Sequence, residues 1–165
     1  MEETTMRPTF LTVLCILTFL GSGWGIVDSV IDYFSAETAG DAIEMVEETM
    51  DDAMDEIDDN DDMSEKQKDF ITNMMGGIIE SLTPENIRKS SIVNFLSCLL
   101  TLFGAILMWQ LKRNGYFLYI AGIAVMVIGM AVIFKGIIGL AAAGATAFIG
   151  VLFIVLYGVN LKHMK

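Results

Sequence analysis

The chain has 165 residues, of which 54% are hydrophobic, and it carries a formal net charge of -11. Its mean hydropathy of +0.58 is higher than that of ordinary soluble domains, because its apolar residues are gathered in long uncharged runs. The single histidine, His163, lies in the C-terminal tail, so the sequence does not supply the histidines that histidine-based catalytic triads and zinc clusters need. The acidic balance also argues against nucleic acid as a partner, since like charges repel.

Four stretches contain no charged side chain, and they cover residues 8–27, 90–111, 117–134 and 136–161. Each is close to or above the roughly 20 residues that a helix needs to cross a hydrocarbon core of about 30 Å. Because backbone groups in lipid must satisfy one another, these runs are expected to be helices. The predicted fold is an all-α membrane protein with four transmembrane helices, whose first partner is the lipid bilayer.

The first run allows two interpretations. A cleaved signal peptide also has a basic residue, an apolar stretch and then small residues, as at positions 21–25. However, Glu2 and Glu3 weaken the basic N-terminal region, and the apolar run continues to Val27. We therefore expect residues 1–35 to form the N-terminus and an uncleaved first span.

A family resemblance rests on the opening of this span, which reads Arg7-Pro8-Thr9-Phe10-Leu11-Thr12-Val13-Leu14-Cys15-Ile16-Leu17-Thr18-Phe19. This opening resembles the start of small uncharacterised bacterial four-span inner-membrane proteins. The resemblance covers the first span and the general four-span layout. It implies a bacterial inner membrane, and it implies no established activity.

Two acidic residues, Asp28 and Asp32, follow the first span one helical turn apart, beside Tyr33 and Phe34. Aromatic residues at this position are typical of a membrane interface. The two aspartates could form a cation site at a pore mouth, which would suit a channel or transporter component. We favour a solvated helix exit, because ionisable groups carry function mainly when they lie inside the membrane.

Residues 37–69 contain 15 of the 21 acidic residues of the chain. Nine of them recur at alternating steps of three and four, which places them on one face of a helix. These nine are Asp41, Glu44, Glu48, Asp51, Asp55, Asp58, Asp62, Glu65 and Asp69. Apolar residues keep the same rhythm nearby, so the pattern predicts an amphipathic helix and not a disordered tail.

A second helix is predicted after Ser64, because Ser64 and Gln67 form a capping-box pattern. Two legs of roughly 20 residues each would extend about 30 Å from the membrane and return to it. The predicted element is an acidic extramembrane helical hairpin over residues 36–89. The apolar side chains expected to pack on one another or to dock on a partner are Ile43, Val46, Met50, Ile57, Phe70, Met74 and Ile78.

Part of this segment is similar to a calcium-binding loop. Asp58, Asn60, Asp62 and Asp69 stand at positions one, three, five and twelve of an EF-hand-like pattern. The pattern departs from that motif because Met63 replaces its glycine and its last ligand is Asp instead of Glu. Divalent cations are therefore a candidate ligand, and no other cofactor is indicated.

Residues 90–165 are predicted to form a three-span antiparallel bundle with a short basic tail, because only tight turns separate the last three spans. Small residues at helical spacing let two helices approach closely. The small residues expected to mediate this packing are Gly122, Gly129, Gly139, Ala143 and Ala147.

The basic residues near the span ends predict the orientation. Cytoplasmic termini would place five of them on the inner side, namely Arg7, Lys112, Arg113, Lys162 and Lys165. The outer side would then hold three near the membrane, namely Arg88, Lys89 and Lys135. The excess on the inner side favours cytoplasmic termini and a periplasmic segment over residues 36–89.

The sequence leaves three functions open. The favoured one is a non-enzymatic integral membrane subunit that packs into or docks on a larger membrane assembly. Its partners would be other membrane-protein subunits or further copies of the same chain. The alternatives are a sensor or buffer that responds to calcium or magnesium, and a channel or transporter component. No catalytic residue is predicted.

Overall fold

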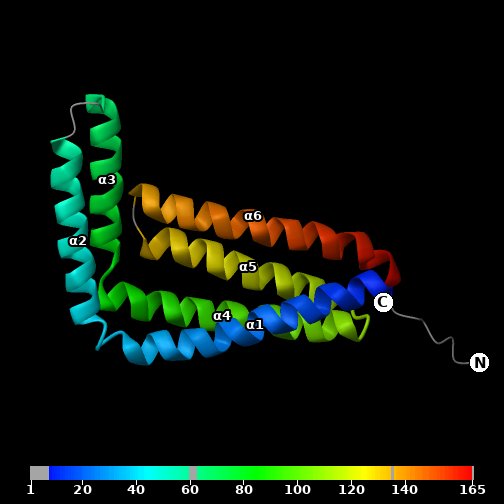
Figure 1. Cartoon of the computed structure of the whole chain (residues 1–165). Coiled ribbons are helices and arrows are strands. Elements are labelled where there is room, and N and C mark those ends of the chain that lie inside the picture. The colour runs from blue at the N-terminus through cyan, green and yellow to red at the C-terminus, as the bar shows by residue number, and fades with distance from the viewer. Residues whose placement is uncertain (1–7, 60–62, 135, 165) are drawn as a thin grey trace, which may run out of the picture.

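The computed structural model describes residues 8–59, 63–134 and 136–164, and this part of the chain contains helices and no strand. The helices are α1 (Thr9–Ser35), α2 (Gly40–Asp58), α3 (Glu65–Ser81), α4 (Pro84–Trp109), α5 (Asn114–Ile133) and α6 (Gly136–Asn160), with a final 3-10 turn at Leu161–His163. Figure 1 shows α1, α4, α5 and α6 running along one another as a bundle, while α2 and α3 lie across one end of it.

Four helices, α1, α4, α5 and α6, are long and apolar enough to cross a membrane. They contain 27, 26, 20 and 25 residues, which meets the length that a hydrocarbon core requires. The predicted class, an all-α protein with four apolar spans, is therefore confirmed.

The starts of α3 and α4 follow from local sequence. Before α3, the backbone N–H of Ser64 donates to Oε1 of Gln67 over 3.2 Å, which completes the predicted capping box. Before α4, the Thr83 hydroxyl oxygen accepts from the backbone N–H of Asn86 at 3.2 Å. Pro84 occupies the first helical position, where its missing N–H costs nothing.

The four spans do not form a closed ring. α1 packs along α4, α4 along α5, and α5 along α6. Over the described residues α1 and α6 have few contacts with each other, and Figure 1 shows them approaching at the end near the termini and separating toward α2 and α3. The bundle is therefore open along its α1–α6 side.

The tightest contact between spans joins α4 and α5 at Gly104 and Gly115. A Cβ atom added to Gly104 would lie 2.8 Å from the carbonyl oxygen of Gly115 and 2.8 Å from the backbone nitrogen of Tyr119. A Cβ atom at Gly115 would meet the carbonyl oxygen of Gly104. The two backbones touch here, and only glycine leaves them room.

The small residues that the sequence singled out for packing lie in different places. Gly122 and Gly129 face α4, since a Cβ atom on either would meet an α4 side chain. Gly139 and Ala143 are buried on α6, and Ala147 is half-buried there. The prediction omitted the Gly104 and Gly115 pair, whose residues lie eleven apart across a turn and share no helical periodicity.

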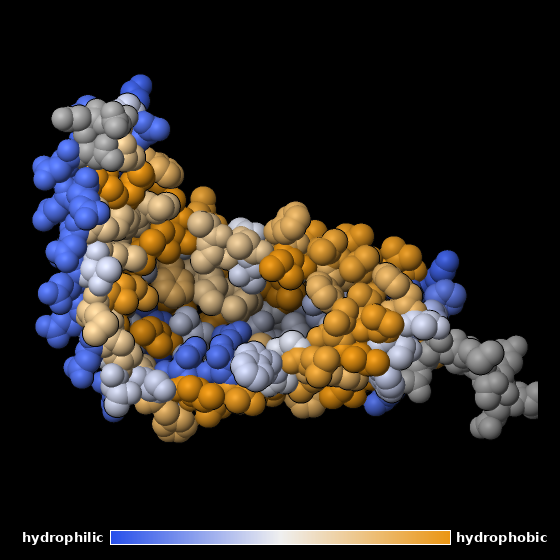
Figure 2. Space-filling view, viewed as in Figure 1, coloured by the Kyte–Doolittle hydropathy of each residue, from blue (hydrophilic) through white to orange (hydrophobic). Residues whose placement is uncertain are grey.

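The direction of α2 and α3 differs from the direction expected from the sequence. The two helices lie side by side and cross the end of the bundle instead of extending away from it along the spans (Figure 1). Figure 2 shows hydrophilic residues along the outer side of α2 and hydrophobic residues on the side turned toward the bundle. Two contacts accompany this arrangement. Arg88 forms an ion pair with Glu37 at 2.9 Å, and Gly77 of α3 approaches Ile138 of α6.

We expect Gly104→Ala to destabilise the protein, because its Cβ atom has no room between α4 and α5. Overpacking of this kind costs typically about 1–3 kcal/mol. The matched control is Gly144→Ala on α6, where an added Cβ atom meets nothing within 4 Å. Thermal unfolding in mild detergent should show a lower melting temperature for Gly104→Ala than for Gly144→Ala. Equal melting temperatures would contradict the proposed closeness of the two backbones.

Candidate functional site

A groove of about 300 Å³ lies on the open side of the bundle, between α1 and α6. Its lining comes from all four spans and combines apolar side chains with hydroxyl groups and glycines. The hydroxyl-bearing residues are Thr18, Ser22, Ser97, Thr101, Tyr119 and Thr146, and the glycines are Gly21 and Gly150. Hydroxyl groups at this depth are costly unless they form hydrogen bonds.

A buried cluster closes one end of the groove. The hydroxyls of Thr18 on α1 and Tyr157 on α6 form a hydrogen bond of 2.8 Å. The ring of Tyr119 from α5 packs on Tyr157 with 5.0 Å between ring centroids. Nearby, the Cys15 thiol donates to the carbonyl oxygen of Ala105 on α4 over 3.7 Å. These contacts hold the four spans together at this end, and α1 and α6 diverge from it.

A chain of hydroxyls lies along the floor of the groove. The Thr101 hydroxyl donates to the carbonyl oxygen of Ser97 at 3.0 Å, and the Ser97 hydroxyl donates to the carbonyl oxygen of Gly122 at 2.8 Å. Ser22 on α1 lies 2.9 Å from the Thr101 oxygen. Either hydroxyl can be the donor in this pair, and the Thr101 hydroxyl also lies within hydrogen-bond distance of the carbonyl oxygen of Cys98, at 3.1 Å.

Hydroxyl oxygens of the groove keep lone pairs beyond these bonds. Ser22 shares one hydrogen bond with Thr101, and Thr146 donates to the carbonyl oxygen of Ala142 at 2.8 Å. Each hydroxyl can still accept hydrogen bonds. Among the residues that the structure describes, none with a carboxylate, amine or imidazole lines the groove. The groove can therefore accept hydrogen bonds from a donor group of a ligand. The rest of its lining consists of glycines and apolar side chains.

This groove was not expected from the sequence. A signal was present, because Thr18 and Ser22 are four residues apart and so are Ser97 and Thr101, which places each pair on one helical face. The spacing within α1 and within α4 could not show that these two faces meet. That depends on how the spans pack.

The predicted cation ligands are not brought together in the described residues. Asp58 ends α2 and Asp69 lies in α3, while Asn60 and Asp62 fall outside the described residues. Over residues 8–59, 63–134 and 136–164, no group of three or more His, Cys, Asp or Glu side chains could hold a metal ion. The calcium-like pattern stays a prediction.

The predicted docking residues of α2 and α3 divide by exposure. Val46 and Phe70 are exposed, at 37% and 57%. The remaining five are half-buried, namely Ile43, Met50, Ile57, Met74 and Ile78. Most of the predicted docking surface is thus partly covered within the protein itself.

We expect the Thr18 and Tyr157 hydroxyls to stabilise the bundle as a pair. Thr18→Val, Tyr157→Phe and the double variant should give a coupling energy near 0.6 kcal/mol and at most about 1.7 kcal/mol, the range of hydrogen bonds between membrane helices. Unfolding in detergent measures it. The control is Tyr116→Phe, whose hydroxyl makes no hydrogen bond to a described residue. Strict additivity of the two single variants would show that the bond contributes nothing.

Comparisons of the chain with protein families, curated proteins and solved structures give no match. The case for a function therefore rests on the residues and geometry described above.

Proposed function

We propose that the protein is a non-enzymatic integral membrane subunit that receives a transmembrane helix of a partner protein in the groove between α1 and α6. The observation that carries this proposal is the open side of the bundle. α1 and α6 separate beyond the Thr18–Tyr157 contact, and the groove between them offers hydrogen-bond acceptors at the depth of the spans.

A helix suits this groove better than lipid chains do. Acyl chains carry no hydrogen-bond donor, so they leave the free lone pairs of Ser22 and Thr146 without a partner. A helix with Ser, Thr, Asn or Gln at the contact supplies such donors. Gly21 lines the groove on the α1 side, where an added Cβ atom meets nothing within 4 Å, and a small residue there allows another backbone to come close.

The second element of the proposal is the acidic segment. We place α2 and α3 outside the bilayer as an acidic hairpin, on the periplasmic side of a bacterial inner membrane, with both termini cytoplasmic. The crosswise direction of these helices supports a position along the membrane surface if the spans stand upright. Their acidic outer side would attract a basic surface of the same partner.

Filling the groove should release the partner. Gly21→Leu adds a large side chain from α1, and a Cβ atom there meets nothing within 4 Å, so the chain itself can accommodate it. The matched control is Gly144→Leu, which is equally unobstructed on the exposed face of α6 but does not line the groove. Both changes raise helix propensity equally.

We expect membranes solubilised in mild detergent to give a complex larger than the monomer on native gels. Gly21→Leu should shift the chain to the monomer position, while Gly144→Leu should leave the complex intact. A wild-type chain that runs as a monomer, or two variants that behave alike, would contradict the proposal. A complex whose mass is a multiple of this chain would identify the partner helix as a second copy.

Topology can be tested with single cysteines. Glu48→Cys on the exposed side of α2 should react with a membrane-impermeant maleimide added to intact cells, whereas Lys112→Cys in the α4–α5 turn should react only after permeabilisation. The wild type is the control, since Cys15 is buried and Cys98 is half-buried within the spans. Labelling of both positions from the same side would overturn the proposed orientation.

A further inference from the structure

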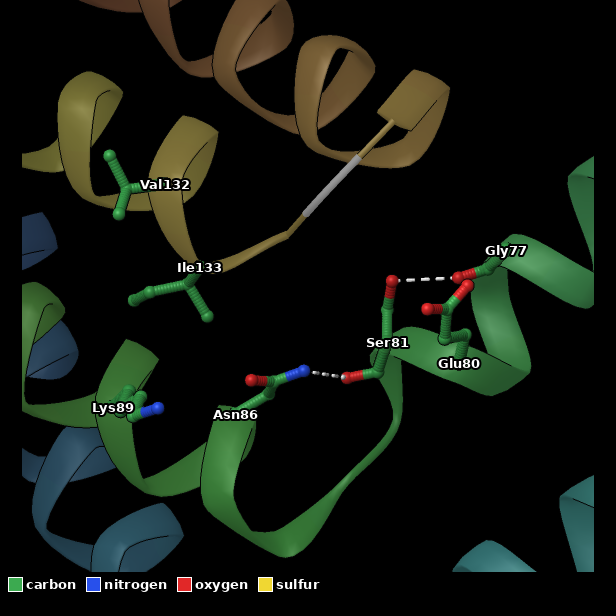
Figure 3. Close-up of a pocket in the computed structure, with 7 residues that line it drawn as sticks. All are labelled: Gly77, Glu80, Ser81, Asn86, Lys89, Val132 and Ile133. Carbon is green, nitrogen blue, oxygen red and sulfur yellow. Dashed lines mark hydrogen bonds between the residues drawn. The ribbon is translucent and has the colours of Figure 1, made fainter.

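A second cavity, of about 380 Å³, lies where α3 crosses the ends of α4 and α5 (Figure 3). Three helices contribute to it, and their contributions differ in polarity. The residues that matter here are Glu80 and Ser81 from α3, Asn86 and Lys89 from α4, and Val132 and Ile133 from α5. The cavity therefore has a polar wall of α3 and α4 and an apolar wall of α5.

The cavity lies at the ends of the two apolar spans α4 and α5. Lys89 lies in the second turn of α4, which begins at Pro84, and it precedes the uncharged part of that span. Val132 lies in the last turn of α5 and is 70% exposed on the outside of the bundle. Polar groups meet a lipid-facing side chain here, which is the arrangement at a membrane interface.

The cavity is lined by one negatively charged and one positively charged side chain, Glu80 and Lys89, which form no ion pair with each other. Lys89 forms an ion pair with Glu85 on its own helix at 2.6 Å, and Glu80 forms no ion pair with any residue that the structure describes. Figure 3 shows Glu80 and Lys89 on opposite sides of the cavity. Asn86 donates its amide N–H to the carbonyl oxygen of Ser81 at 3.2 Å, so its own side-chain oxygen remains an acceptor.

We propose that this cavity binds the headgroup of a phospholipid with a primary ammonium group, such as phosphatidylethanolamine. The ammonium group lies against the Glu80 carboxylate, which accepts its N–H groups. The phosphate group lies against Lys89, and the acyl chains run down along Val132. Charge-assisted hydrogen bonds of this kind are the strong ones. Phosphatidylcholine lacks the N–H donors, and phosphatidylglycerol lacks the positive charge.

The test is native mass spectrometry of the full-length chain with phosphatidylethanolamine, phosphatidylcholine and phosphatidylglycerol of identical acyl chains. We expect phosphatidylethanolamine to bind most tightly. Glu80→Gln should weaken its binding about tenfold, the equivalent of losing one hydrogen bond to a charged group, and should weaken phosphatidylcholine less, because that lipid loses only the attraction of opposite charges. The matched control is Glu56→Gln on the exposed side of α2, which makes the same chemical change away from the cavity.

A second variant tests the other side of the cavity independently. Lys89→Gln should weaken phosphatidylethanolamine and phosphatidylcholine alike, because the phosphate group is common to both. It removes an exposed ion pair of small energetic value, so the fold should persist. Three results would overturn the proposal: equal binding of the two zwitterionic lipids, a Glu80→Gln variant that behaves like Glu56→Gln, or preference for phosphatidylglycerol. Soluble phosphoethanolamine that binds as tightly as the lipid would overturn the assignment to a membrane lipid.

Discussion

Hydroxyl groups buried among apolar helices need hydrogen-bond partners within the protein, and in this chain such pairs connect α1 to two other spans. Ser22 of α1 shares a hydrogen bond with Thr101 of α4, and Thr18 shares one with Tyr157 of α6. α4 and α5 are joined through the close backbones of Gly104 and Gly115. These contacts join α1 to α4 and α4 to α5, and they hold the first and last spans together at one end. The open groove is what remains between α1 and α6.

The groove and the α3 cavity lie at different depths and have different chemistry. The groove holds hydroxyl oxygens and glycines among apolar side chains, which suits another helix. The α3 cavity holds a carboxylate, an ammonium group and an amide beside an exposed valine, which suits the proposed lipid headgroup. α3 creates the second site because it crosses the ends of the spans, where Gly77 approaches Ile138 and Arg88 pairs with Glu37. The crosswise α2 and α3 thus do more than present acidic residues to solvent.

Much of this fold could be predicted from local sequence. Uncharged runs identified the spans, Ser64 with Gln67 marked the start of α3, and Thr83 with Pro84 marked the start of α4. The direction of α2 and α3 could not be predicted, because periodicity tells which face of a helix is apolar and not where the helix points. That direction depends on contacts such as the one between Arg88 and Glu37, which are 51 residues apart. The groove was missed for the same reason, since its hydroxyls come from helices that meet only in the folded chain.

A partner helix is proposed to fill the space between α1 and α6. The most direct measurement places a photoreactive amino acid at position 21, where a side chain has open space, and irradiates cells that contain the full chain. The account predicts a covalent adduct to a membrane polypeptide, whose cross-linked peptide maps to a transmembrane segment. Adducts formed with lipid alone would show that the groove is an ordinary lipid-facing surface, and would contradict the account.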